Sequence, residues 1–168
     1  MQEELKLLGQ YGLRNKQELW RQKTMLSKFR GTARSLIGKT AEERRKMENE
    51  LLTRLKKLGI LPDTAVLDDV LDLTLGDILE RRLQTVILRK GLAKTIQQAR
   101  QLITHGHIAI GNRRVTIPSY ILTKPEENLI SYAPRSHLSN ANHPLRQAIQ
   151  VAPTTTETST NSRREEQE

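Results

Sequence analysis

The side chains whose types and spacing first suggest chemistry are two histidines and a pair of adjacent arginines within residues 99–115, ARQLITHGHIAIGNRRV. His105 and His107 flank a glycine where a helix-like pattern of apolar residues stops, and Arg113 and Arg114 follow a Gly-Asn pair. Such a segment could hold a metal ion, cradle a phosphate, form a catalytic dyad or bind an acidic partner. The elements that position these side chains decide among the four.

A metal site and a nucleotide-binding loop are both disfavoured. His105 and His107 are expected to end a helix and begin a strand, so their side chains need not converge, and the chain has no cysteine. Gly106 to Gly111 has the glycine spacing of a phosphate loop. However, Asn112 and Arg113 stand where that loop requires lysine followed by serine or threonine. We therefore expect neither a bound metal nor a nucleotide cofactor.

A cluster of aspartates is the best candidate for catalysis, because a metal-dependent nuclease could use one. No histidine or lysine lies among them, and the last of them falls in the first turn of an expected helix, where it complements the helix dipole. A solvated acidic hinge between two basic modules explains the cluster better, and no Ser/His/Asp arrangement is evident. The sequence indicates that the protein is not an enzyme. The cluster is Asp63, Asp68, Asp69, Asp72 and Asp77.

The charge of the chain points to a polyanionic partner. It has 28 Lys+Arg against 19 Asp+Glu, a net charge of +9, and the excess falls in residues 1–60 and 81–150 on either side of the acidic residues 61–80. Clustered cations gain free energy by releasing counterions from phosphates. Aromatic residues make up only 3% of the chain, too few for a row of base-stacking platforms, so we expect recognition of backbone and shape. Without a long apolar run or a signal peptide, we also expect a soluble, cytoplasmic protein.

Residues 1–73 predict a basic helical module that includes the acidic hinge. Each of its two expected helices begins with a capping residue and an acidic partner three positions later, Asn15 with Glu18 and Thr40 with Glu43. Gly59 suits the left-handed residue that ends the second helix. Most charged residues on such helices are solvated, but four on the first helix are candidates for nucleic-acid contact: Arg21, Lys28, Arg30 and Arg34.

Residues 74–133 predict a second module of two helices and a small sheet. One helix runs from a Thr74 cap to Gly91, and a shorter one runs from a Thr95 cap to Gly106. A later strand around 129–132 follows the polar turn TKPEEN and could complete a small antiparallel sheet. The predicted fold class is α+β.

Between these elements, apolar residues alternate around the turn Gly111-Asn112, which predicts a β-hairpin. That turn pairs Ile108 with Val115 and places both on the buried face with Ile117. Ala109, Arg114 and Thr116 are then expected to face outward. Pro118 argues that the return strand ends there or runs at an edge.

A shared basic surface is the favoured explanation of the opening stretch. The helix ends and the hairpin tip are expected to lie close together. Arg100 and Arg114 matter most, since a planar guanidinium can bind two phosphate oxygens at once. The candidates in this module are Arg81, Arg82, Lys90, Lys94, Arg100, Gln101, His105, His107, Arg113 and Arg114.

The remaining residues predict an arm and a tail. Residues 134–150, which include His137 and His143, are loop-like and mildly basic, the composition of an arm that orders on a partner. Residues 151–168 have almost no apolar side chains and are expected to be disordered in isolation.

The segment GLAKTIQQARQLITHGHIAI, followed by RRVTIPSYIL, closely resembles the RNA-binding module of small-subunit ribosomal protein four, the S-four family. YGLRNKQELWR and LERRLQTVILRKGLAK resemble the archaeal and eukaryotic branch, and YAPRSHLSNANHPLR looks archaeal. The resemblance covers about residues 3–149. It places a set of side chains at family positions that face RNA: Arg82, Lys94, Arg100, Gln101, His105, His107 and Arg114.

The resemblance implies a structural protein of the small ribosomal subunit that binds its ribosomal RNA directly and early. Such a protein nucleates assembly of the subunit body and contributes to translational accuracy. Its implied partners are small-subunit ribosomal RNA, neighbouring ribosomal proteins and messenger RNA where it enters the ribosome. Two rival classes fit less well. An RNA-modifying enzyme needs a catalytic aspartate in a sheet-rich domain, and a DNA-binding regulator needs a recognition helix and usually a dimer seam.

Overall fold

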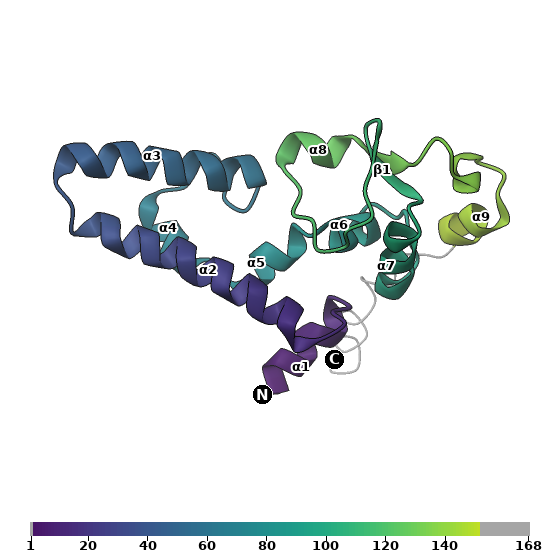
Figure 1. Ribbon diagram of the computed structural model, residues 1–168, viewed down its shortest axis with the longest axis horizontal. Coiled ribbons are helices and arrows are strands. Elements are labelled where there is room, and N and C mark those ends of the chain that lie inside the picture. Colours follow the sequence, from purple (N-terminus) through teal and green to yellow (C-terminus); the bar gives the residue numbers. More distant parts are fainter. Residues whose placement is uncertain (1, 152–168) are drawn as a thin grey trace, which may run out of the picture.

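The computed structural model describes residues 2–151, which form an elongated molecule of class α+β, as predicted. Figure 1 shows α2 and α3 at one end, α6, α7 and the sheet at the other, and α5 between them. The helices are α1 (Gln2–Gln10), α2 (Lys16–Ile37), α3 (Ala41–Leu58), α4 (Leu67–Asp72), α5 (Leu75–Glu80), α6 (Leu83–Arg89), α7 (Ile96–Thr104), α8 (Lys124–Asn128) and α9 (Pro144–Val151). The strands are β1 (Ile108–Ile110), β2 (Arg113–Arg114) and β3 (Ile130–Tyr132), and a 3-10 turn, η1, spans His137–Ser139.

Helix α2 organises the helical end. Its buried face, which includes Leu26, Phe29 and Ala33, packs against α3, α4 and α5 in one apolar cluster. Asn15 caps it as predicted, by accepting a hydrogen bond from the Glu18 amide at 3.1 Å. Thr40 makes no capping hydrogen bond at the start of α3, contrary to prediction. Gly59 does end α3, with φ of +69°. Helix α1 was not foreseen from the sequence.

The single helix expected between Thr74 and Gly91 is instead two short helices, α5 and α6. At the break, Arg82 forms an isolated antiparallel bridge with Ile121, and the Leu83 amide donates to the Tyr120 carbonyl at 2.7 Å. The chain therefore exchanges helical hydrogen bonds for bonds to the segment after the hairpin. Periodicity cannot show this change, because the apolar residues on both sides of the break keep helical spacing.

The sheet has the order β2-β1-β3 and is antiparallel throughout. Ile110 lies opposite Arg113, so Gly111 and Asn112 form the turn as predicted. Ile108 and Val115 are buried, also as predicted, in the cluster formed with α6 and α7. Arg114 and Thr116 are exposed, as expected.

Two expectations about the hairpin were wrong. Ile117 is 55% exposed, because the chain leaves the sheet after β2 and no longer alternates with it. Ala109 is fully buried, because it lies between Arg114 on one neighbouring strand and Ser131 on the other.

The chain after the hairpin is more structured than its composition suggested. TKPEEN, expected to be a polar turn, contains the short helix α8, whose Glu126 accepts a hydrogen bond from the Thr123 amide at 2.9 Å. The arm also packs on the molecule, since Leu138 is 3% exposed within the core cluster of the α6–α7 end. The expected disorder of the tail concerns residues that lie, apart from Val151, outside those described.

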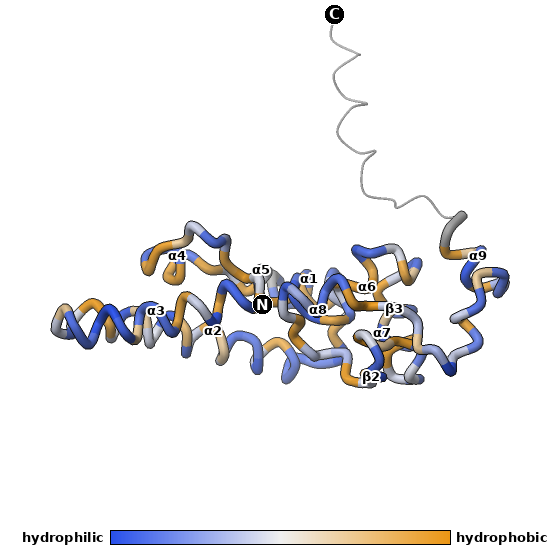
Figure 2. The backbone as a smooth tube through the Cα atoms, turned by 90° about the horizontal axis from the view of Figure 1, so that it is seen from above, coloured by the Kyte–Doolittle hydropathy of each residue, from blue (hydrophilic) through white to orange (hydrophobic). Residues whose placement is uncertain are grey.

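Figure 2 shows the same arrangement from above, with α2 to α4 on one side of α5 and α6, α7 and the strands on the other. A small apolar cluster joins the two ends: Tyr11, Leu13, Leu19 and Leu79. None of the helices in residues 2–151 has the length and apolar character needed to cross a membrane.

Candidate nucleic-acid interface

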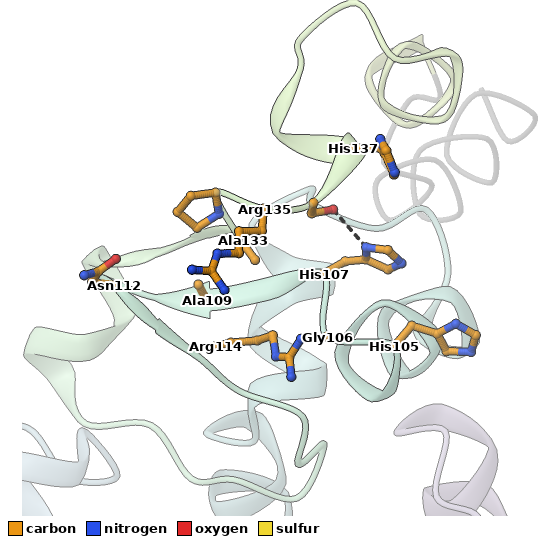
Figure 3. A pocket seen from close by; sticks show the side chains of 11 residues that line it. His105, Gly106, His107, Ala109, Asn112, Arg114, Ala133, Arg135 and His137 are labelled. Carbon is orange, nitrogen blue, oxygen red and sulfur yellow. Dashed lines mark hydrogen bonds between the residues drawn. The ribbon is translucent and has the colours of Figure 1, made fainter.

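A hollow of about 530 Å³ lies where α7, the hairpin and the arm meet, and we call it the basic hollow. Figure 3 shows the side chains around it. Its lining residues are His105, Gly106, His107, Ala109, Asn112, Arg114, Ala133, Pro134, Arg135, Ser136 and His137.

The end of α7 positions the first wall. His105 caps the helix, and Gly106 turns the chain into β1 with φ of +75°, a conformation that favours glycine. A Cβ atom at Gly106 would lie 3.0 Å from the Arg114 Cδ atom. Glycine at this turn therefore leaves room for the side chain of Arg114 to lie across it.

The arm forms the opposite wall. The Ala133 amide donates to the His107 carbonyl at 2.8 Å, which extends the pairing of β1 and β3 by one residue. The His107 Nδ1 atom lies 2.8 Å from the Ser136 hydroxyl. Beyond it, buried Leu138 ties the arm to the core. The histidine is thus held in place by the segment that sequence analysis expected to be an unattached arm.

The electrostatic character of the basic hollow is one-sided. Two arginines and three histidines line it, and none of its eleven residues has a carboxylate. The rings of His105 and His107 lie roughly parallel, with centroids 6.2 Å apart. Arginine side chains with no competing carboxylate suit phosphate oxygens. The lining contains no pair of acids and no histidine–carboxylate pair, so the arrangement is suited to binding an anion rather than to acid–base catalysis.

Across the part of the chain that the structure describes, no three histidine or acidic side chains gather closely enough to hold a metal ion. Of the two stacked histidines, His107 meets the Ser136 hydroxyl, and no carboxylate is among the residues that line the hollow.

The residues that the sequence suggested for RNA binding fall into three groups. Three of them line the basic hollow: His105, His107 and Arg114. Seven are exposed elsewhere on the surface: Arg21, Lys28, Arg34, Lys90, Lys94, Gln101 and Arg113. Of these, Lys90 also donates a hydrogen bond to the Glu127 carbonyl. The third group is directed inward: Arg30, Arg81, Arg82 and Arg100.

Arg82 and Arg100, which the family resemblance places facing RNA, both have a partner within the protein. Arg82 is 1% exposed, and its Nη2 atom lies 3.0 Å from the Glu18 carboxylate. Arg100 donates to both oxygens of the same carboxylate, at 2.5 and 3.3 Å, and also reaches the Gly12 carbonyl at 3.3 Å. One acidic side chain from α2 therefore takes up both guanidinium groups. We call Glu18, Arg82 and Arg100 the Glu18 cluster.

Arg81 and Arg30 also have structural partners. Arg81 donates to the Leu58 carbonyl at 2.9 Å and to the Glu127 carboxylate at 2.7 Å, which links the end of α3 to α8. Arg30 donates to the Leu73 carbonyl at 2.5 Å. These contacts explain why basic residues in an RNA-binding pattern need not all be RNA contacts.

The Glu18 cluster also sets the charge of its carboxylate. Burial raises the pKa of Glu18, but the hydrogen bonds and charges of Arg100 and Arg82 outweigh burial and hold its pKa below the usual value. Sequence analysis assigned Glu18 only to the cap of α2. A local pattern could not show that its side chain reaches α6 and α7, because those partners lie 64 and 82 positions away.

Arg135 and His137 are site residues that sequence analysis missed, because they lay in the segment taken as a loop-like arm. Their position directly after the expected strand at 129–132 could have indicated that they belong to the site. In an antiparallel pair, the residues that follow one strand can lie beside the start of its neighbour.

Comparison with known proteins identifies the family. Residues 81–128 match the family described as the S4 domain. The small ribosomal subunit protein uS4 of Ignicoccus hospitalis is 59% identical over 134 residues, which cover 80% of this chain and 81% of that protein. The chain belongs to the uS4 family. Other uS4 proteins agree: that of Hyperthermus butylicus is 56% identical over 79% of this chain and 76% of its own, and that of Nanoarchaeum equitans is 49% identical over 92% and 87%.

Membership of the uS4 family confirms the resemblance seen in the sequence, including its archaeal character. It also confirms the expectation that the chain is not an enzyme, since these relatives are ribosomal proteins. The S4 domain match runs from Arg81 to Asn128, so it includes the first wall of the basic hollow but ends before the second, residues 133–137.

Proposed function

We propose that this uS4 protein is a structural component of the small ribosomal subunit that binds its ribosomal RNA directly. The observation that carries the proposal is the basic hollow, with Arg114, Arg135 and three histidines and without a carboxylate. Phosphates of a folded RNA supply the matching charge, and contacts to phosphates position a protein on RNA without reading sequence. The names of the uS4 relatives place those proteins in the same subunit.

The finer role in this proposal is the one that the resemblance to the S-four family implies. A protein that binds the RNA before its neighbours do would nucleate assembly of the subunit body, and in the finished subunit it would influence translational accuracy. Neighbouring ribosomal proteins, and messenger RNA where it enters the ribosome, are the further partners of this proposal, which places the protein in the cytoplasm.

A binding measurement tests the proposal. The full chain is titrated with RNA that contains the five-prime domain of small-subunit ribosomal RNA, and with scrambled RNA of the same size, over a salt series. We expect at least about tenfold preference for the ribosomal RNA. The double variant Arg114→Ala/Arg135→Ala should weaken binding and make the slope of log affinity against log salt shallower by about 1.5.

Arg44→Ala is the matched control, because Arg44 is a 41%-exposed arginine on α3 paired with Glu48 and remote in sequence from the hollow. We expect a smaller change in the salt slope for this variant than for the double variant. Equal affinity for ribosomal and scrambled RNA at every salt concentration would contradict the proposed function. An unchanged slope in the double variant would remove the basic hollow from it.

A further inference from the structure

Helix α2 exposes the only tryptophan of the chain. Trp20 is 52% exposed, whereas the residues on the opposite face of the helix, such as Leu19, Leu26 and Phe29, are buried against α3, α4 and α5 or the α1 region. A single exposed apolar residue is ordinary in a soluble protein. The surroundings of Trp20 are what distinguish it.

Trp20 forms one end of a shallow hollow of about 440 Å³. The other lining residues follow at three, four, seven and eight positions, so all five lie on one face of the helix. The hydroxyl of Thr24 donates to the Trp20 carbonyl at 2.9 Å, which keeps that short side chain against the helix. The lining is therefore a flat indole ring followed by two small hydroxyl residues and flanked by two amines: Trp20, Lys23, Thr24, Ser27 and Lys28.

The exposed charge of α2, the helix that lines this hollow, is entirely positive. The exposed charged side chains of α2 are all cations: Lys16, Arg21, Lys23, Lys28 and Arg34. The helix has one acidic residue, Glu18, and its carboxylate is taken up by Arg82 and Arg100. No carboxylate on this helix competes with an incoming anion.

These observations favour RNA over a protein partner. The core of a protein interface requires a group of apolar side chains. The next large apolar side chain exposed on α2 is Ile37, 17 residues further along, which is about 25 Å at the rise of an α-helix. On α2, Trp20 is thus a single exposed aromatic ring among cations. That combination fits a nucleobase, which stacks on the ring while its flanking phosphates meet the amines.

We propose that Trp20 stacks on an unpaired base of the RNA, with Lys23 and Lys28 binding the phosphates on either side of that base. The proposal rests on the proposed function, RNA binding, and adds a base contact on the helical module, away from the basic hollow. It also refines the expectation from composition: the chain has too few aromatic residues for a row of stacking platforms, yet it has one.

Trp20 provides its own reporter, because its emission is the only tryptophan signal of the full chain. The protein is titrated with the five-prime-domain RNA and, separately, with inorganic polyphosphate, which carries phosphates but no bases. Binding is followed independently by filter retention. We expect the RNA to quench the emission of Trp20 at saturation and polyphosphate to leave it nearly unchanged.

Two sets of variants complete the test. Trp20→Leu keeps an apolar side chain on the helix and should weaken RNA binding about tenfold, the effect of losing one stacked base. Ile37→Ala is the matched control, since Ile37 is 51% exposed on the same helix, and it should change affinity less than about twofold. Lys23→Gln/Lys28→Gln should make the salt slope shallower by about 1.5 while the helical circular dichroism stays that of the parent.

The outcomes separate this proposal from the proposed function. RNA binding with unchanged Trp20 emission, and with Trp20→Leu as tight as the parent, would overturn the stacked base and leave RNA binding intact. Equal quenching by polyphosphate would also overturn it, because charge alone would then explain the signal. Loss of preference for ribosomal RNA over scrambled RNA would overturn the proposed function itself.

Discussion

At the scale of single residues, Glu18 makes long-range contacts that its local capping pattern does not predict. Its amide donates the capping hydrogen bond of α2 to the Asn15 side chain, while its carboxylate binds Arg82 and Arg100. The Gly12 carbonyl accepts from Arg100 and, at 3.2 Å, from the side chain of Gln84. Gly12 has φ of +56°, and a Cβ atom there would lie 2.9 Å from Gln84 and Ile96. These hydrogen bonds and ion pairs join the segment that contains Gly12 and Glu18 to α6 and α7.

Replacing Glu18 by glutamine tests this cluster. The variant leaves Arg82, which is 1% exposed, without its counter-charge, and an uncompensated buried charge costs about 3 kcal/mol of unfolding free energy. Urea denaturation measures the difference. Glu48→Gln is the control, because Glu48 pairs with Arg44 on the surface of α3, where such a pair contributes about 0.5 kcal/mol or less. Equal losses in the two variants would show that the Glu18 cluster has no special role.

The same cluster predicts a pH dependence of stability. Because the folded state lowers the pKa of Glu18, its stabilisation is fully present above the carboxyl's usual value of 4.5 and is lost as the pH falls through the lowered pKa. Between about pH 6 and pH 3, the parent should lose more unfolding free energy than Glu18→Gln. Denaturation at several pH values measures this difference. Parallel curves for the two proteins would contradict the assignment.

At the scale of elements, local signals succeed where a contact is local. Asn15, Thr74 and Thr95 each accept the predicted capping hydrogen bond from a backbone amide three residues later. The break between α5 and α6 has no such signal, because it is made by Tyr120 and Ile121 from beyond the hairpin. A capping hydrogen bond between near neighbours can be predicted from the sequence, whereas a β-bridge to a distant segment cannot.

Helix α2 contains a glycine whose replacement should stabilise the protein. Gly31 is exposed in the middle of the helix, and a Cβ atom there would meet nothing within 4 Å. Alanine reduces the conformational entropy lost on folding, so Gly31→Ala should raise the unfolding free energy by about 0.8 kcal/mol. Thermal unfolding measures the change. A lower stability would mean that α2 needs the flexibility of glycine at this position.

At the scale of the whole molecule, two basic ends meet at a junction where Arg82 and Arg100 form ion pairs with Glu18. Each end has its own apolar cluster, and a smaller cluster with the Glu18 cluster lies between them. Opposite charges placed at this junction hold the ends in one arrangement, while the arginines left on the surface remain free for a polyanion.

Because one arginine is paired at the junction and the other lies on the surface, Arg100 and Arg114 should differ in their effects on stability and on RNA binding, although both were RNA-binding candidates from the sequence. Arg100→Ala should lower the unfolding free energy by about 2 kcal/mol, since it removes hydrogen bonds to a charged partner, and leave the salt slope of RNA binding unchanged. Arg114→Ala should leave stability nearly unchanged and make that slope shallower by about 0.8. Urea denaturation and a salt series measure the two effects. A shallower slope for Arg100→Ala with unchanged stability would return Arg100 to the RNA surface.

The sequence by itself determined the α+β class, the main helices, the hairpin turn at Gly111-Asn112 and the family. These depend on periodicity, caps and turns within a few residues, or on a motif read along the chain. Only the tertiary structure decided which cations are free. Arg82 and Arg114 look equally available in the sequence, but one meets Glu18 from α2 and the other lies on the surface beside the arm. The availability of a charge depends on its neighbours in space, and those neighbours are brought together only when the chain folds.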